Sequence, residues 1–104
     1  PTWAKGLAKS VWRSLEKRFS GIHHWTDAGV ASWYDFAVAI QEEAHTLNIL
    51  SSLVKIRPVP ASHYPTAAKR PNFSVLDKRS LLDKLSITPV HWRSQLRSML
   101  MELT

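Results

Sequence analysis

Cationic and aromatic side chains gather in one proline-rich stretch, residues 62–77. Lys69 and Arg70 stand directly before a proline, with Tyr64 and Phe73 on either side. Because proline fixes φ and lacks a backbone N–H, the stretch is predicted to be a loop rather than a helix interior or a central strand. Two cations on a stiffened backbone suit a phosphate or diphosphate, and the rings could flank a flat base or a sugar. Alternatively, the rings pin the loop to the core while the cations stay solvated. The residues alone leave both interpretations open.

The other residues that can carry chemistry form no recognised motif. The chain has no Gly-x-Ser-x-Gly turn, no P-loop and no glycine-rich dinucleotide turn, and it contains three glycines in all. Neither tyrosine is followed by a lysine four residues later. The five histidines lack metal-like spacing, and the absence of cysteine excludes disulfides and thiolate metal sites. Taken alone, the chain looks chemically incomplete.

The charge balance favours an anionic partner. Fourteen Lys and Arg oppose eight Asp and Glu, giving a net charge of +6, which suits nucleic acid or a phosphorylated small molecule. A row of cations on one helix face could contact phosphates, although such rows are more often simply solvated; it comprises Lys5, Lys9, Arg13 and Lys17. No nucleic-acid-binding signature is present, so no nucleic acid is expected. A small basic nucleic-acid-binding module and a protein-interaction domain remain the alternatives.

The scaffold is predicted to be one helix-rich α/β domain over residues 1–104, since 104 residues with 44% hydrophobic content fit a single core. The segments with helical spacing are residues 3–19, 32–47, 78–85 and 91–103. The segments with strand character are residues 22–25 and 54–57, with a brief one at 75–76. Strand, helix and strand across residues 22–57 predict a βαβ unit with a right-handed crossover.

Two helices carry the clearest patterns. Ser32 and Asp35 have the spacing of a capping box, which predicts the start of the second helix, with Gln41, Glu42 and Glu43 on its solvent side. The first helix has an apolar stripe formed by Ala4, Leu7, Ala8, Val11, Leu15 and Phe19. The longest apolar run, residues 36–40, is far too short to span a membrane, and no signal peptide is visible. A cytoplasmic protein without a membrane partner is expected.

Several segments together resemble one enzyme family. The run from Tyr64 to Pro71 (Tyr-Pro-Thr-Ala-Ala-Lys-Arg-Pro), followed by Ser-Val-Leu-Asp at 74–77, resembles the hallmark loop of dTDP-4-dehydrorhamnose reductases. These enzymes are extended short-chain dehydrogenases/reductases. Residues 29–37, the initial Pro-Thr and the His-Trp helix at the C-terminus are similar to further segments of the family, in the same order. The resemblance covers the whole chain.

This resemblance covers only the C-terminal, substrate-binding part of the family. The Rossmann domain, with the glycine-rich NADPH turn and the catalytic Tyr and Lys, would precede Pro1, so the chain is expected to be a fragment of a larger two-domain enzyme and inactive alone. The implied parent reduces the C4 ketone of dTDP-4-dehydro-L-rhamnose with NADPH, the last step of dTDP-L-rhamnose biosynthesis for cell-surface polysaccharides. Implied partners are the dTDP-sugar, the missing Rossmann domain and a second copy of the chain in a homodimer.

The resemblance also implies roles for four residues of the loop. Arg70, together with Lys69, would pair with the diphosphate, while Tyr64 and Thr66 would shape the loop. Two departures stand out: the family often has proline at the position of Ala67 and asparagine at that of Phe73.

A metal site is a further implication of the resemblance. Some members bind magnesium at a dimer interface through carboxylates, and Glu102 matches one of these positions. Lys5 stands where another carboxylate would be. A cation in place of a ligand argues against magnesium, so a metal is doubtful and Glu102 is a weak candidate.

Overall fold

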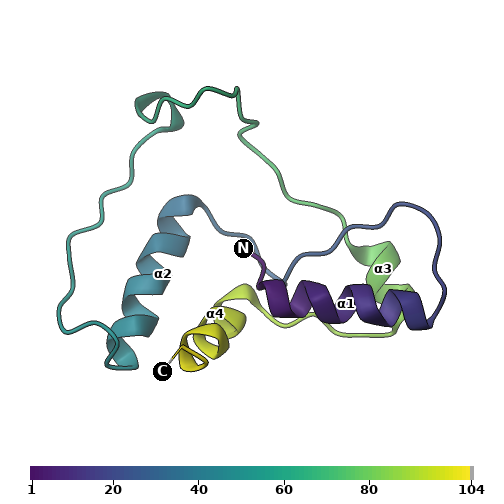
Figure 1. Ribbon diagram of the computed structural model, residues 1–104. Helices are drawn as coiled ribbons and strands as arrows, with labels where there is room; N and C mark the ends of the chain where they lie inside the picture. The colour runs from purple at the N-terminus through teal and green to yellow at the C-terminus, as the bar shows by residue number, and fades with distance from the viewer. Residues whose placement is uncertain (104) are drawn as a thin grey trace.

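The computed structural model describes residues 1–103 and contains four α-helices and one short 3₁₀ helix (Figure 1). Their bounds are α1 Ala4–Glu16, α2 Trp33–Thr46, η1 Ala61–His63, α3 Arg79–Leu85 and α4 Trp92–Met101. The four helices predicted from periodicity are confirmed, each with ends within a few residues of the prediction. None of them has the length and hydrophobicity needed to cross a membrane.

The helices pack as two pairs, each joining an early helix to a late one. Helix α2 packs against α4, and α1 packs against α3 (Figure 1). The main core lies between α2 and α4 and is formed by Ala39, Ala44, Trp92, Leu96 and Leu100. Phe36 meets Trp92 edge-on, with ring centroids 6.0 Å apart. In the second pair, Leu81 and Leu85 are buried.

Helix α2 begins with the predicted capping box. The Ser32 hydroxyl accepts a hydrogen bond from the Asp35 backbone N–H at 3.1 Å, and the Asp35 carboxylate accepts one from the Ser32 backbone N–H at 2.8 Å. Two hydrogen bonds donated by Ser32 lower the pKa of Asp35, and the bond from the backbone N–H has a larger effect than the bond from the hydroxyl. Local hydrogen bonding therefore fixes this end of the helix.

Helix α1 is turned with its apolar stripe outward. Ser10 is the buried residue of the helix, and its hydroxyl donates to the Leu7 carbonyl at 2.7 Å. On the other side, Leu7 and Val11 are exposed, and Leu15 keeps 65% of its surface accessible. Periodicity correctly predicted the helix, but no element among residues 1–103 covers the part of the stripe formed by Leu7, Val11 and Leu15.

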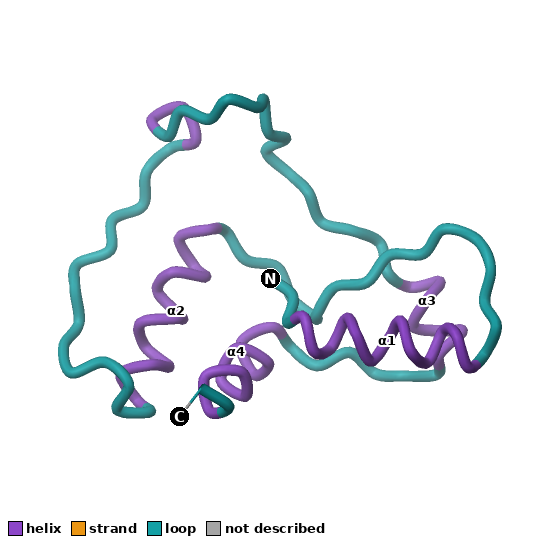
Figure 2. Tube along the Cα trace, in the orientation of Figure 1, coloured by secondary structure: helices purple, strands orange, loops and turns teal. Residues whose placement is uncertain are grey.

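The predicted βαβ unit is not formed. The segments at 22–25, 54–57 and 75–76 have no assigned secondary structure, the described part of the chain has no ladder, and Figure 2 shows loop at all three. The one bridge in that part joins Ala28 to His91 in parallel, with Trp92 N donating to Ala28 O at 2.9 Å. A strand needs a neighbour for its backbone groups, and residue 54 instead donates to the side chain of Gln41 at 2.6 Å. The helix-rich part of the α/β prediction is thus seen, whereas no strand is found among residues 1–103.

The chain between α2 and α3 arches away from the helices (Figures 1 and 2). The radius of gyration is 16.3 Å, whereas a compact domain of this length has about 13 Å. The difference comes from this arch and from the side-by-side placement of the two helix pairs, and the longest dimension of the molecule is 47 Å.

Candidate functional site

The candidate site is the loop formed by residues 55–77, called here the 55–77 loop, and it contains all four predicted ligand-binding residues. Tyr64 follows η1 and is 71% exposed. The Thr66 hydroxyl donates to the Ala68 carbonyl at 2.7 Å, which tightens the turn before the two cations. Lys69 and Arg70 are exposed, and neither makes a hydrogen bond or an ion pair with any residue in 1–103. The structure thus places the four on one exposed arc rather than around an enclosed cavity.

The two aromatic rings of the loop do not reach the core. Phe73 is 75% exposed, and Tyr64 is similarly open. Of the two interpretations left open by the sequence, pinning of the loop by its rings is not seen in this structure. The rings are available to a ligand or to another protein surface.

The loop is a region of uncompensated positive charge. No Asp or Glu occurs between Glu43 and Asp77, whereas this interval holds four fixed cations: Lys55, Arg57, Lys69 and Arg70. The helices, in contrast, bring carboxylates and cations together. An anion that approaches the loop therefore meets no acidic competitor on it. Sequence reasoning missed Lys55 and Arg57, and the acid-free interval was the signal that could have found them.

The C-terminal end of the loop carries a local, exposed ion pair and is held by a long-range contact. Asp77 accepts hydrogen bonds from the Arg79 guanidinium, the shortest at 2.6 Å, and from the Arg79 backbone N–H at 3.0 Å. The guanidinium bonds lower the pKa of Asp77 to about 2. The sequence pattern favours Asp77 as the cap of this helix, but Lys78 occupies the N-cap position and no side chain caps α3 there. Lys78 Nζ donates to Thr26 Oγ1 at 2.9 Å and to the Asp27 carbonyl.

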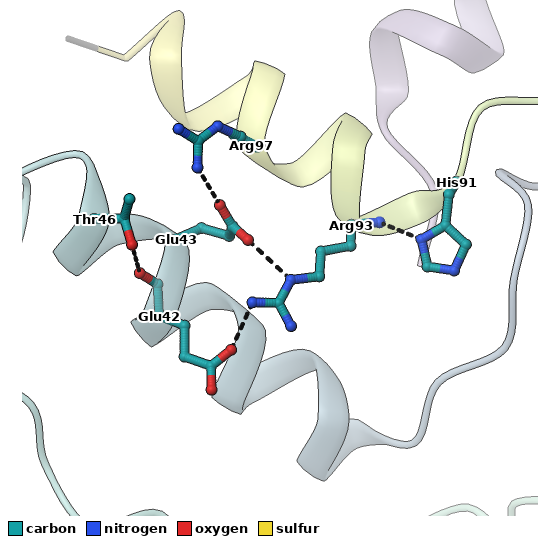
Figure 3. A network of polar contacts seen from close by, with 6 residues as sticks. All are labelled: Glu42, Glu43, Thr46, His91, Arg93 and Arg97. Atoms are coloured by element: carbon teal, nitrogen blue, oxygen red, sulfur yellow. Dashed lines mark hydrogen bonds and ion pairs between the residues drawn. The ribbon is translucent and has the colours of Figure 1, made fainter.

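A polar network joins α2 to α4 (Figure 3). Arg93 donates to Glu43 Oε1 at 2.8 Å and to Glu42 Oε2 at 2.6 Å, and Arg97 donates to Glu43 Oε2 at 2.9 Å. The hydrogen bond from Arg93 lowers the pKa of Glu43 against the opposing effect of desolvation. The prediction that Glu43 faces water is wrong, because its carboxylate is buried between the two helices and paired there. We assign this network to packing of the scaffold.

The remaining candidates do not form a site. Glu102 accepts from Lys5 Nζ, and the described residues contain no group of three or more metal-ligating side chains. Magnesium therefore has no donor set among them. In the basic row along α1, Lys5 is paired with Glu102 and Lys17, just past the helix, donates to the Lys84 carbonyl at 3.5 Å, so two of the four cations are engaged within the chain. The three glycines lie apart in the sequence and form no glycine-rich dinucleotide turn.

Comparison with known proteins decides the family. The family model described as the RmlD substrate binding domain matches residues 1–104. The chain belongs to this family. The resemblance noted in the sequence is thereby confirmed over its whole length.

Three relatives illustrate the range of the family. The spore coat polysaccharide biosynthesis protein SpsK of Bacillus subtilis (strain 168) is 37% identical over 102 residues, covering 98% of this chain and 33% of that protein. Two dTDP-4-dehydrorhamnose reductases are each 33% identical to the chain. For that of Aggregatibacter actinomycetemcomitans the match covers 94% of this chain and 35% of the relative, and for that of Escherichia coli (strain K12) it covers 99% of this chain and 36% of the relative. The chain thus spans about a third of the length of the curated relatives it matches.

Proposed function

We propose that the chain binds a dTDP-sugar through the 55–77 loop, as the substrate-binding part of an NADPH-dependent dTDP-4-dehydrorhamnose reductase in dTDP-L-rhamnose biosynthesis. The observation that carries the proposal is the whole-chain match to the RmlD substrate binding domain. Two relatives named as this reductase and one named for spore coat polysaccharide biosynthesis support the sugar-nucleotide class.

The loop offers the chemistry that a sugar nucleotide requires. A diphosphate bridge carries two negative charges, and the planar guanidinium of Arg70 can donate to it in bidentate fashion, with Lys69 adding a compact charge beside it. Tyr64 exposes a flat face on which a thymine or a sugar can lie. Thr66 uses its proton within the loop, so its role is to shape the turn rather than to donate to the ligand.

The reduction itself is assigned to a partner domain. Hydride transfer needs a bound nicotinamide and a positioned proton donor, and this chain has neither a dinucleotide turn nor a Tyr-x-x-x-Lys pair. A Rossmann domain of the same longer protein would supply both, and the chain alone would be inactive. The exposed apolar stripe of α1, residues 7, 11 and 15, is a surface on which such a domain can dock.

Titration calorimetry with dTDP and dTDP-rhamnose tests the binding role. We expect both to bind, with a heat signal that weakens as salt rises, because the diphosphate contact is ionic. The acid-free loop also makes a single-stranded oligonucleotide the natural competitor, since a basic loop with exposed rings can hold one. Binding of the oligonucleotide together with no binding of either dTDP compound would overturn the proposal in favour of a nucleic-acid-binding module.

The coding sequence upstream of Pro1 tests the enzymatic part. We expect it to encode a glycine-rich strand-turn-helix followed by Tyr-x-x-x-Lys, and the longer protein to oxidise NADPH in the presence of dTDP-4-dehydrorhamnose. A longer protein that carries those motifs but ignores dTDP-sugars would contradict the assigned substrate.

A further inference from the structure

Among residues 1–103, the hydrogen bonds that tie the 55–77 loop to the scaffold lie at its two ends. At the start, the backbone N–H of residue 54 donates to Gln41 Oε1 on α2 at 2.6 Å. At the end, Lys78 Nζ donates to Thr26 Oγ1 at 2.9 Å and to the Asp27 carbonyl. Between these points, residues 55–77 make hydrogen bonds only to one another and to Arg79, as far as the described chain shows. The side chains of Gln41 and Lys78 therefore supply the long-range hydrogen bonds at the two ends of the loop.

Lys78 contacts a segment that is itself firmly held. Asp27 is only 2% exposed, and its Oδ2 accepts from the backbone N–H of Trp3 at 2.9 Å, at the start of α1. The next residue, Ala28, donates its N–H to Val90 O at 2.8 Å, and its carbonyl accepts from Trp92 N. The ammonium of Lys78 is thus tied to a point where α1 and α4 are already joined.

The neighbouring cation has no such contact. The Arg79 guanidinium turns back to Asp77, and both side chains are largely exposed. Lys78 is partly buried and reaches across 52 positions of sequence to Thr26. Of two adjacent residues of equal charge, therefore, only Lys78 joins the loop to the scaffold through its side chain.

We propose that Lys78 is a positioning residue for ligand binding: it fixes the arm that carries Lys69 and Arg70 at the distance and direction that a bound diphosphate needs. The proposal rests on the proposed function, because it assumes an anionic ligand at the loop. A free arm must lose conformational entropy on binding, and an arm anchored beforehand loses less. Lys78 does not itself touch the ligand in this proposal.

The test compares Lys78→Met with Arg79→Met, since both variants remove one positive charge and they lie at adjacent positions. Affinity for dTDP is measured by titration calorimetry, and the backbone order parameters of residues 62–77 are measured by NMR relaxation. We expect Lys78→Met to weaken dTDP binding roughly tenfold, the scale of one charged hydrogen bond, and to lower the order parameters of the loop. Arg79→Met should leave the affinity within about twofold and the order parameters unchanged, because an exposed pair contributes little.

Two further variants guard against an unfolded Lys78→Met. Lys78→Arg keeps the long cationic donor and should recover part of the lost affinity. Thr26→Val removes one acceptor without changing charge and should show a smaller effect in the same direction. Equal losses in Lys78→Met and Arg79→Met would overturn the proposal, since charge alone would then explain them. If the unaltered chain fails to bind dTDP, the proposed function is contradicted, and the comparison of order parameters by itself still decides whether Lys78 anchors the loop.

Discussion

At the scale of single residues, two glycines lie in opposite packing environments. Gly29 has a φ of +90°, and a Cβ built there would collide with the His91 ring, whereas a Cβ on Gly6 would be at an ordinary 3.4 Å from the Gln95 amide. We expect Gly29→Ala to lower the free energy of unfolding by about 2 kcal/mol or more. Gly6→Ala, inside α1, should raise it by up to about 1 kcal/mol. Urea unfolding measures both, and a neutral Gly29→Ala would contradict this packing.

Substitution of the two loop arginines, Arg70 and Arg57, distinguishes a specific contact with the diphosphate from general electrostatic attraction of an anion. Arg70→Ala should weaken dTDP binding by roughly tenfold or more, because it removes charge-assisted hydrogen bonds to the diphosphate. Arg57→Ala removes the same charge from the other arm of the loop and should cost less than about threefold, through weaker long-range attraction alone. Calorimetry at two salt concentrations measures the pair. Equal losses would show that the loop attracts anions without forming a defined site.

At the scale of elements, acid should weaken the contact between α2 and α4. The pKa of Glu43 is lowered from its usual 4.5, chiefly by the hydrogen bond from Arg93. The stability that ionised Glu43 contributes is therefore complete above about pH 4.5. It is lost as the pH falls through the pKa of Glu43 in the folded state, which is lower. We expect Glu43→Gln to lower the free energy of unfolding by about 2 kcal/mol at pH 7. Between about pH 5 and pH 2, the free energy of unfolding of this variant should fall less steeply than that of the unaltered chain. The exposed Glu16→Gln serves as the control and should keep the slope of the unaltered chain.

Features that depend on neighbours in the sequence could be predicted, whereas features that depend on distant partners could not. The capping box of α2 was predictable because Ser32 and Asp35 interact within one helical turn. The lack of paired strands at 22–25 and 54–57 was not predictable, because alternation shows that a segment can pair but not whether a neighbour is present. The burial of Glu43 was missed because its partners, Arg93 and Arg97, lie 50 and 54 positions away. Within the site, the proline pattern identified the loop, but its attachment through Lys78 depends on a contact that no local pattern encodes.

At the scale of the whole molecule, the outward stripe of α1 should govern association. Val11 is 52% exposed and Leu15 more so, which leaves apolar surface in water. We expect the chain to self-associate as its concentration rises, and the double variant Val11→Lys, Leu15→Lys to be monomeric without loss of stability. Sedimentation velocity and thermal unfolding measure the two effects. A large fall in melting temperature would show instead that the stripe is packed within the chain.

The pairing of early helices with late ones has a consequence for cutting the chain. A single nick in the 55–77 loop would yield one piece with α1 and α2 and another with α3 and α4, and each packed pair takes one helix from each piece. Trypsin cleaves poorly before proline, so the bonds after Arg57 and Arg70 should resist it while those after Lys55 and Lys69 are open to attack. The two pieces should therefore stay together after limited digestion. The loop is then a natural split point, where two inactive halves could be expressed separately and brought back into one fold.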